Sequence, residues 1–352
     1  MLAGMSSSSA PAPVRTSPHA TEELQAWVSG TLGTIRLNRP QALNAMTLDM
    51  VQAMDRVLQD WEEDDAVQAV VLYGAGERGL CAGGDIRAIA SGTDAQAMEF
   101  WTAEYALNAR VAAFPKPYVA VMDGVVMGGG VGVSGHAGIR IATERTRAAM
   151  PEVRIGFSPD CAGALLLARA PGELGTHLAL TAGTMTGADA VLCGFADSYV
   201  PSDSLPALLA ALDSAGSDAA EVVAKFAVAP PEAPLGAERE WIDECYAGED
   251  IAAILEKLDR HCAPAAQEAA QAIRAMAPFS LSVALAALRA AAAEPDLGKV
   301  LERDLVMADR MIGRPDFREG VRARLLDRDQ PRWNPARLAG VDPRDVAWTL
   351  AL

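Results

Sequence analysis

Two hydrophobic patterns divide the chain. Apolar runs at 32–37, 67–73 and 118–122 are bounded by turn residues and predict strands. Apolar residues at helical spacing over 48–61 and about 95–113 predict helices between those strands. Strands that alternate with helices in this way indicate an α/β fold.

After Asp160 the pattern becomes helical, with short helices predicted at 162–170, 173–182, 187–193 and 205–211. We find no convincing strand from about 217 onward. Prolines at 230, 231 and 234 form the clearest linker. Ala-rich amphipathic segments predict helices at 238–246, 250–260, 264–276, 280–292, 296–311 and 316–327. The predicted organisation is therefore an α/β core over residues 21–215 and a helical C-terminal portion over residues 216–352.

Composition excludes several classes of function. The formal net charge of −16 argues against nucleic acid as the main partner, although local Arg and Lys residues can still meet a phosphate. No apolar run reaches membrane-spanning length. Five scattered cysteines without a Cys-x-x-Cys pair indicate a reducing compartment, and four isolated histidines offer no metal-ligand spacing.

The first 20 residues are rich in Ser, Ala and Pro, and we predict that residues 1–20 form a disordered tail. They lack the charged start and apolar core of a secretory signal. With a single Arg and no acid, a transit peptide is the weaker alternative. We therefore expect a cytoplasmic protein.

The stretch from Met127 to Asp160 carries the candidate chemistry. The glycine triplet 128–130 follows a predicted buried strand and reads as the start of a helix, where backbone N–H groups are free. Such a site suits a developing negative oxygen. Glu152 and Asp160 then place two carboxylates in an otherwise apolar loop, and an oxyanion site beside two acids indicates carbonyl chemistry.

A second glycine-rich segment, 74–79, matches G-x-G-x-x-G after a strand. A dinucleotide site requires a helix to open within that motif. Two further glycines at 83 and 84 oppose a helix, so we interpret the segment as a strand-to-loop turn.

Several blocks in order resemble the crotonase (enoyl-CoA hydratase/isomerase) superfamily, and within it the 3-hydroxyisobutyryl-CoA hydrolase branch. The likeness is strong over about 30–200 and loose over the helical remainder. The blocks are Leu37-Asn-Arg-Pro-Gln-Ala-Leu-Asn44, Cys81-Ala-Gly-Gly-Asp-Ile86, Glu104-Tyr105, Lys116-Pro117-Tyr118, Met127-Gly-Gly-Gly-Val-Gly132, Ala142-Thr-Glu-Arg-Thr146, Met150-Pro-Glu152 and Pro159-Asp160.

The resemblance implies a spiral of ββα units that binds acyl-CoA between its glycine loops. It implies that the N–H groups of Gly84 and Gly129 form the oxyanion hole for the thioester oxygen. It also places Glu104, Gly129, Glu152 and Asp160 where this branch keeps its substrate-binding and catalytic residues. The expected reaction is hydrolysis of a short 3-hydroxyacyl-CoA, in the branch a step of valine catabolism.

In that reaction Glu152 either activates a water as general base or attacks as nucleophile, and the sequence does not separate these routes. Asp160 would orient the hydroxyacyl group or share the proton, and Glu104 would hold its hydroxyl. No metal or redox cofactor is implied, since CoA is part of the substrate. The alternatives are an enoyl-CoA hydratase or isomerase, and a non-catalytic acyl-CoA-binding protein.

Some of these residues also have purely structural interpretations. Ser158-Pro159-Asp160 can read as the N-cap and first residues of the next helix. A solvated helix face is the default for Glu104, and the glycine triplet could be a tight packing contact. Cys161 has no histidine near it in sequence, so we interpret it as apolar packing rather than as a nucleophile.

The chain departs from the branch pattern beside the acyl pocket. Cys161-Ala162-Gly163 stands where the branch has Val-Gly-Gly, and Ser158 where it has Phe. The identity of the acyl group therefore stays open. Gly132 stands where hydratases of the superfamily carry a second glutamate, which predicts weak hydratase activity.

The CoA phosphates need cations, and Arg39, Arg87 and Lys116 are the candidates from sequence. Crotonase relatives often form trimers or pairs of trimers, which favours a homo-oligomer. The helical C-terminal portion could instead cover the usual interface.

Overall fold

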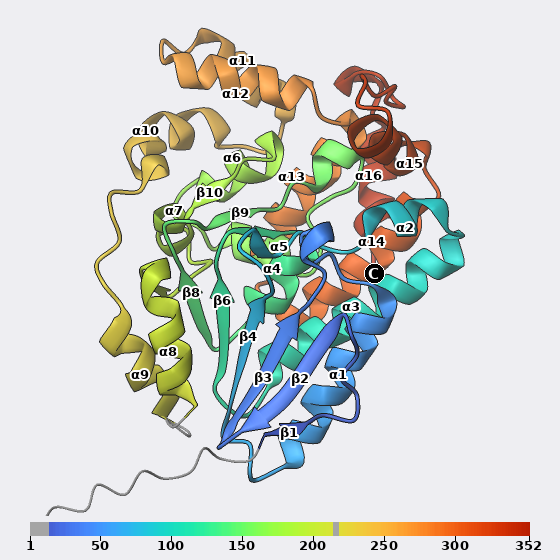
Figure 1. Cartoon of the computed structure of the whole chain (residues 1–352). Helices are drawn as coiled ribbons and strands as arrows, with labels where there is room; N and C mark the ends of the chain where they lie inside the picture. The colour runs from blue at the N-terminus through green and yellow to red at the C-terminus, as the bar shows by residue number, and fades with distance from the viewer. Residues whose placement is uncertain (1–13, 214–217) are drawn as a thin grey trace, which may run out of the picture.

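A seven-stranded sheet forms the centre of the protein (Figure 1). The structure, a computed structural model, describes residues 14–213 and 218–352. The sheet begins with an antiparallel hairpin and continues as parallel strands. In spatial order its strands are β1 (Arg15–Thr16), β2 (Leu24–Ser29), β3 (Leu32–Leu37), β4 (Ala69–Gly74), β6 (Tyr118–Met122), β8 (Ile139–Ala142) and β11 (Ser198–Tyr199).

A smaller four-stranded sheet lies beside the first. Its order is β10 (Met185–Thr186), β9 (Arg147–Ala149), β7 (Val125–Met127) and β5 (Gly79–Cys81). The pairs β4–β5, β6–β7 and β8–β9 each place one strand in the large sheet and the next in the small one. Helical segments follow each pair, so the chain winds as a spiral of ββα units and the predicted fold is confirmed.

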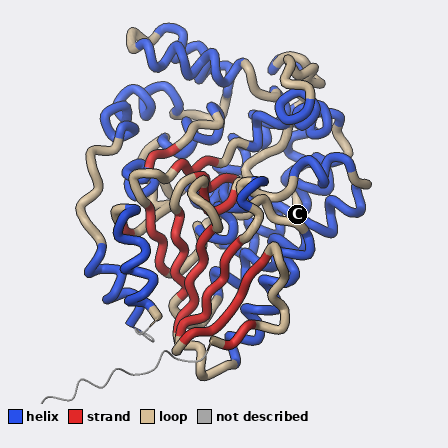
Figure 2. The backbone as a smooth tube through the Cα atoms, in the orientation of Figure 1, coloured by secondary structure: helices blue, strands red, loops and turns tan. Residues whose placement is uncertain are grey.

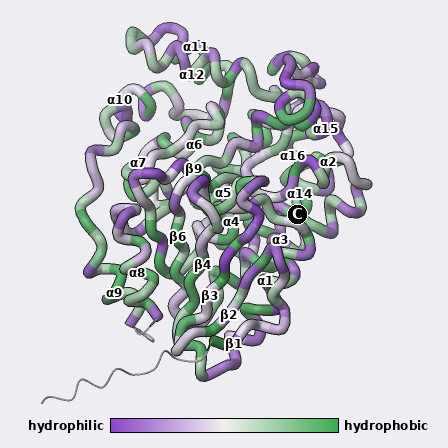
Figure 3. The backbone as a smooth tube through the Cα atoms, viewed as in Figure 1, coloured by the Kyte–Doolittle hydropathy of each residue, from purple (hydrophilic) through white to green (hydrophobic). Residues whose placement is uncertain are grey.

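Both faces of the large sheet are covered, which explains its uninterrupted apolar strands (Figure 2). In β4, Val70 and Leu72 belong to the main core, whereas the intervening Val71 packs in a second cluster. The helices over this second face are α8 (Leu205–Leu212) and α9 (Ala219–Phe226). Strand β6 is likewise rich in apolar residues, as the hydropathy colouring of the backbone shows (Figure 3).

The helices of the core agree with the periodicity of the sequence. Thr47 caps α1 by accepting a hydrogen bond from the Met50 N–H, and a capping box at Thr93 begins α3. The core elements besides the strands are η1 (Pro40–Ala42), α1 (Leu48–Glu63), α2 (Ile86–Ser91), α3 (Asp94–Ala113), α4 (Gly129–Ser134), η2 (Glu152–Ile155), α5 (Gly163–Ala168), α6 (Leu174–Thr181), α7 (Gly187–Leu192) and η3 (Ser202–Ser204).

The C-terminal portion consists of helices that lie across one end and one side of the core (Figure 1). Helix α14 packs on α3, and α13 packs on α5 and α6. The elements are α10 (Pro234–Tyr246), α11 (Ile251–Arg260), α12 (Pro264–Arg274), α13 (Pro278–Ala293), α14 (Leu297–Ile312), α15 (Pro315–Val321), the π-helix η5 (Arg322–Leu326), η6 (Leu338–Gly340) and α16 (Pro343–Leu350).

Two features of the predicted organisation involve residues outside the ranges that the structure describes. The boundary between 215 and 216 falls within 214–217, outside them. Of the tail predicted over 1–20, residues 1–13 also lie outside. Disorder is wrong for residues 14–20, because Arg15–Thr16 forms β1 and the Ser17 N–H bonds the Ala26 carbonyl at 2.9 Å.

The G-x-G-x-x-G segment forms a turn between two strands. Gly74 ends β4 and Gly79 begins β5, and the next helix opens only at Ile86. Within 14–213 and 218–352 no single helix is long and apolar enough to cross a membrane. Helices α12 and α13 reach the length and apolar character of a membrane span only when they are taken together, and a bend of 113° separates them.

Candidate active site

A cavity of about 720 Å³ lies where the core meets the C-terminal helices. Its core lining contains every residue named from the sequence as catalytic, oxyanion-binding or substrate-binding: Gly84, Glu104, Gly129, Glu152 and Asp160. The C-terminal portion contributes Ala272, Ala275, Met276, Phe317, Arg324 and Leu325.

Each glycine of the triplet 128–130 lies so close to a different residue that it leaves little room for a side chain. A Cβ on Gly128 would lie 3.0 Å from Glu152 Oε1, and one on Gly129 would lie 2.0 Å from Glu104 Oε1. A Cβ on Gly130 would lie 2.3 Å from the Cys81 carbonyl oxygen. The packing interpretation therefore holds, because the absent side chains let two carboxyl groups reach the start of α4, and the functional interpretation stays a prediction.

Two backbone N–H groups are free to bind a ligand oxygen. Gly129 is the first residue of α4, where an N–H has no acceptor inside the helix. Among the described residues neither this N–H nor that of Gly84 has a hydrogen-bond acceptor. The two glycine loops lie against each other, since a Cβ on Gly83 would be 3.4 Å from the Gly129 nitrogen.

Glu104 comes from α3, and the default expectation of a solvated helix face is wrong for it. Its side chain lies on the buried stripe of the helix, three residues after Trp101 and four before Asn108. Only 2% of the residue is exposed, and Oε1 has no hydrogen-bond partner among the described residues. A buried acceptor without a partner is costly, which is characteristic of a group kept for a ligand.

Glu152 opens the 3₁₀ helix η2 and is 7% exposed. Its Oε2 is buried and, within the described part of the chain, has no hydrogen-bond partner. The C-terminal helix α15 packs closely against η2. A Cβ on Gly320 would lie 2.4 Å from the Ile155 carbonyl, and a Cβ on Gly156 would lie 2.3 Å from the Asp316 carbonyl oxygen. Such close backbone contacts fix the position of Glu152.

Asp160 does not belong to a helix cap, and that interpretation is corrected. Helix α5 begins at Gly163 with Ala162 as its N-cap, so the segment Ser158–Asp160 precedes it as a loop. Asp160 is 5% exposed, and its Oδ2 accepts a hydrogen bond of 2.6 Å from the Tyr105 hydroxyl. Tyr105 follows Glu104 on α3, so one helix positions both carboxyl groups.

The turn after Asp160 is strained and is held by an acid from the C-terminal portion. Cys161 and Ala162 both have φ of 54°, a left-handed conformation that costs a non-glycine residue about 1–2 kcal/mol. Asp304, on α14, accepts the Ala162 N–H at 2.7 Å and is 2% exposed. Asp304 is therefore a positioning residue for Asp160, and the sequence analysis did not identify it.

Burial dominates the electrostatics of these acids. Loss of water raises the pKa of Glu104 and of Glu152 well above their usual range, and the charge of Asp160 raises both further. Loss of water also raises the pKa of Asp160 to about 6, against hydrogen bonds that lower it. Each carboxyl group therefore keeps its proton to a higher pH than an exposed acid does, which is suited to acid and base steps at a single centre.

Three aromatic rings form an apolar wall of the cavity. Trp101 and Phe157 are stacked, with ring centroids 4.9 Å apart and planes 10° apart. Phe317, on α15, contacts both rings at centroid distances of 5.8 and 5.6 Å. The acyl end of a substrate would therefore meet both parts of the protein.

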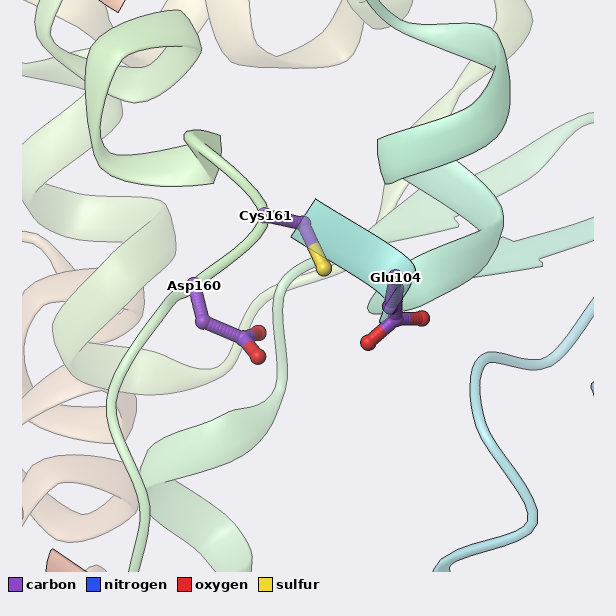
Figure 4. Close-up of side chains that lie close together, drawn as sticks. All are labelled: Glu104, Asp160 and Cys161. Carbon is purple, nitrogen blue, oxygen red and sulfur yellow. The ribbon is translucent and has the colours of Figure 1, made fainter. Parts of the chain in front are cut away.

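Cys161 lies beside the two acids without lining the cavity (Figure 4). Its sulfur and one oxygen each from Glu104 and Asp160 lie within 4.8 Å of one another. Burial raises the pKa of the thiol, so it is a poor nucleophile, and His136 Nε2 contacts the Cys161 carbonyl at 2.8 Å rather than the sulfur. The packing interpretation therefore fits this geometry.

These three groups could reach one metal ion, but their chemistry is unfavourable for it. Metal ligands must be deprotonated, whereas burial raises the pKa of all three. The absence of a metal cofactor stays a prediction.

Two of the three cations proposed from sequence for the CoA phosphates are engaged elsewhere. Arg39 pairs with Glu23 at 3.0 Å and Asp85 at 3.1 Å. Lys116 donates to the carbonyl oxygens of Trp61 and Asp64 at 2.6 and 2.8 Å. Neither residue lines the cavity, so the geometry supports neither as a partner of the CoA phosphates.

Arg87 lies closer, since it donates to the carbonyl of Leu325, which does line the cavity. The arginines that line it directly, Arg154 and Arg324, were not identified from the sequence.

Comparison with known proteins agrees with this geometry. Residues 32–350 match the family described as Enoyl-CoA hydratase/isomerase. The chain belongs to this family. Among curated members, the mitochondrial 3-hydroxyisobutyryl-CoA hydrolase of Danio rerio is 38% identical over 90% of this chain and 86% of its own length. The human protein of the same name is 37% identical over 95% of this chain and 90% of its own length.

Solved structures of the family show the same fold with other names. A carnitinyl-CoA dehydratase from Mycobacterium thermoresistibile has a TM-score of 0.90 and 46% identity, and covers 94% of this chain and 97% of its own. An enoyl-CoA hydratase from Rhodobacter sphaeroides has a TM-score of 0.88 and 39% identity with the same coverage. The resemblance found in the sequence is thus confirmed at the level of the family.

Proposed function

We propose that the protein hydrolyses the thioester of a short 3-hydroxyacyl-CoA, with 3-hydroxyisobutyryl-CoA as the first substrate to test. The observation that carries this proposal is a single cavity that joins two free N–H groups to three buried carboxyl groups. The names of the curated relatives support the same substrate.

Attack on the thioester carbonyl places negative charge on its oxygen. The N–H groups of Gly84 and Gly129 would stabilise that charge, each on the order of 3 kcal/mol. Both donors belong to the backbone of tightly packed loops, so they need no rearrangement during the reaction.

Glu152 would act in its ionised form, either as general base for a water or as the nucleophile that forms a mixed anhydride. Asp160, held by Tyr105, would share the proton or orient the hydroxyacyl group. Glu104 lies against Gly129 and would hold the substrate hydroxyl.

The remaining assignments are part of the same proposal. No cofactor is needed, because a thioester supplies its own leaving group. A homo-oligomer and the absence of a membrane or nucleic-acid partner stay predictions. A cytoplasmic location also stays a prediction, and the relatives reported above carry the word mitochondrial in their names.

An enoyl-CoA hydratase is the competing proposal, favoured by the names of the two similar structures. Hydration in this family uses two glutamates on one water, and the position of the second is Gly132 here. A Cβ at Gly132 would lie 2.9 Å from Asn108 side-chain atoms and from Cys161 Cβ, which leaves no room for a glutamate. The next acid along the chain, Glu144, accepts the Ser202 N–H at 3.0 Å and does not line the cavity.

One preparation can separate these functions. Thiol release from 3-hydroxyisobutyryl-CoA is compared with loss of enoyl absorbance from crotonyl-CoA. We expect hydration at least about 100-fold slower than hydrolysis, because one of two proton-handling groups is missing. Fast hydration without thiol release would replace the hydrolase proposal with the hydratase, and neither activity with retained CoA-ester binding would leave a binding protein.

A further inference from the structure

Two arginines line the cavity without a counter-ion. Arg154 lies on η2, two residues after Glu152, and Arg324 lies on the π-helix η5 of the C-terminal portion. Neither forms an ion pair within residues 14–213 and 218–352. The chain has 46 acidic and 30 basic residues, yet no acid of the described residues pairs with either arginine, so both remain available to an anionic ligand in the cavity.

Arg324 is only partly satisfied by the protein. One of its terminal nitrogens donates to the Ala275 carbonyl at 3.2 Å. Its Nε is buried and, in the described part of the chain, has no acceptor. Burial and then the charge of Arg154 lower the pKa of its guanidinium, which shows that the two positive charges are close enough to repel each other.

The segment that carries Arg324 is held in place by other residues. Arg322 pairs with Glu319 at 2.8 Å, Asp327 at 2.6 Å and Asp329 at 2.8 Å. Arg87 donates to the Leu325 carbonyl at 3.1 Å. The wide turn of a π-helix is frequently found at functional sites, and here its network orients Arg324 before any ligand arrives.

The position of the pair indicates which part of a ligand it meets. Arg154 is exposed, so the pair lies at the solvent end of the cavity. The inner end holds Glu104, Asp160 and the aromatic rings, where a second carboxylate on the acyl group would be repelled. In a CoA thioester the anionic groups are phosphates, remote from the reacting carbonyl, and Arg forms paired hydrogen bonds with phosphate oxygens.

We propose that Arg154 and Arg324 together bind a phosphate group of the CoA moiety. This inference rests on the proposed function for its ligand class, and it assigns the anion site to a π-helix of the C-terminal portion and to the helix that carries Glu152. The phosphate is either the ribose 3′-phosphate or the diphosphate, which share this chemistry.

The test uses three thioesters of one 3-hydroxyacyl group: the CoA ester, the dephospho-CoA ester and the pantetheine ester, which has no phosphate beyond the arm. Arg324→Ala should lower kcat/KM for the CoA ester about 10- to 100-fold, because a hydrogen-bonded charge partner is lost. The pantetheine ester should change less than about twofold, since it cannot use the site.

The dephospho-CoA ester locates the phosphate. A loss confined to the CoA ester identifies the 3′-phosphate, and an equal loss for the CoA and dephospho-CoA esters identifies the diphosphate. An equal loss for all three esters would overturn the proposal, because the arginines would then act on the arm or the acyl group. No loss in the Arg154→Ala/Arg324→Ala variant would overturn it as well.

Two further variants guard against a folding defect. Arg324→Lys keeps the charge without the paired geometry and should retain part of the CoA preference. Arg56→Ala, at an exposed arginine of α1 away from the cavity, is the matched control and should behave as the wild type.

Binding separates this proposal from the proposed function. Calorimetry with free CoA and free pantetheine measures the phosphate site without any hydrolysis. Weaker CoA binding in Arg324→Ala alongside a wild type that hydrolyses no thioester would retain the site and reject the hydrolase. Active hydrolysis by the wild type together with unchanged CoA binding in Arg324→Ala would retain the hydrolase and reject the phosphate site.

Discussion

The core and the C-terminal portion contribute differently to one cavity. The core supplies the groups proposed to react: Glu152 and the two N–H donors follow strands of the small sheet within a few residues, and Asp160 lies in the loop before α5. The C-terminal helices add Asp304, Phe317 and Arg324, which set the position, shape and charge around those groups. We therefore expect the reactive chemistry to depend on the spiral core and the substrate fit to depend on the helices added to it.

The largest effect should come from the core. Glu152→Gln keeps the shape of the side chain but removes its basicity and nucleophilicity, so kcat should fall about 10³- to 10⁴-fold. CoA-ester binding should remain largely intact. Because its pKa is raised, the wild-type rate should also fall with decreasing pH at values above the usual range of a glutamate.

Steady-state thiol release from pH 5 to 9 checks both statements. Glu144→Gln is the matched control, since Glu144 belongs to the core but does not line the cavity. A Glu152→Gln enzyme with near wild-type kcat would remove Glu152 from the mechanism.

A smaller effect is expected from an acid of the C-terminal portion. Asp304→Ala releases the Ala162 N–H and lets the turn after Asp160 move, which should lower kcat about 10- to 100-fold. Asp304→Asn can still accept that hydrogen bond and should lose less. Ala162→Gly should partly restore the Asp304→Ala enzyme, because glycine adopts a positive φ without strain.

The readout is kcat in the single and double variants, with thermal unfolding as the structural control. Equal activity of Asp304→Ala and the double variant would mean that Asp304 acts through helix packing rather than through the turn.

The third prediction concerns stability at Asp160, a proposed catalytic group that the fold buries. The pKa of Asp160 is raised from an unfolded value of 3.8 to about 6, so its contribution to stability is fully present below about 3.8 and is lost as pH rises through about 6. Asp160→Asn cannot ionise and should be more stable than the wild type at pH 8 by about 1–3 kcal/mol, yet less active.

Urea unfolding at pH 4 and pH 8 measures the difference in the free energy of unfolding. That difference should grow toward pH 8. An equal difference at pH 4 and pH 8 would show that burial of the ionised Asp160 side chain does not destabilise the protein.

The smallest effect should come from the aromatic wall. Phe317→Leu removes a ring that packs on Trp101 and Phe157, and KM for the 3-hydroxyacyl-CoA should rise about two- to fivefold with kcat little changed. Phe226→Leu, at the second face of the large sheet, is the aromatic control. A large fall in kcat instead would place Phe317 in the positioning of the carboxyl groups.

Several elements of the fold could be predicted because their signals are local. The strand at 32–37 and the helix ending at residue 113 agree with β3 and α3, since hydrophobic periodicity is set by residues close in sequence. Helices α2, α9 and α16, of six, eight and eight residues, were missed because such short segments are stabilised mainly by the surfaces they pack against. Strand β2 was missed although its alternate residues Leu24, Ala26 and Val28 are buried.

Glu104 and Asp304 share a signal that the sequence does contain. Each is an acid with large apolar residues three positions before and after it: Glu104 with Trp101 and Leu107, and Asp304 with Leu301 and Met307. When these apolar neighbours are given more weight than the usual preference of acids for water, they predict that both side chains are buried.

By itself, the amino-acid sequence determined the fold class, the family and the core acids and glycines that line the cavity, because these depend on periodicity and on local motifs. Only the tertiary structure decided which groups meet across long distances in the chain: Asp304 at the turn after Asp160, Phe317 on the aromatic wall, and Arg324 beside Arg154. These contacts arise when α14, α15 and η5 pack on the core, and a pattern read along one segment contains no information about the segment that will face it.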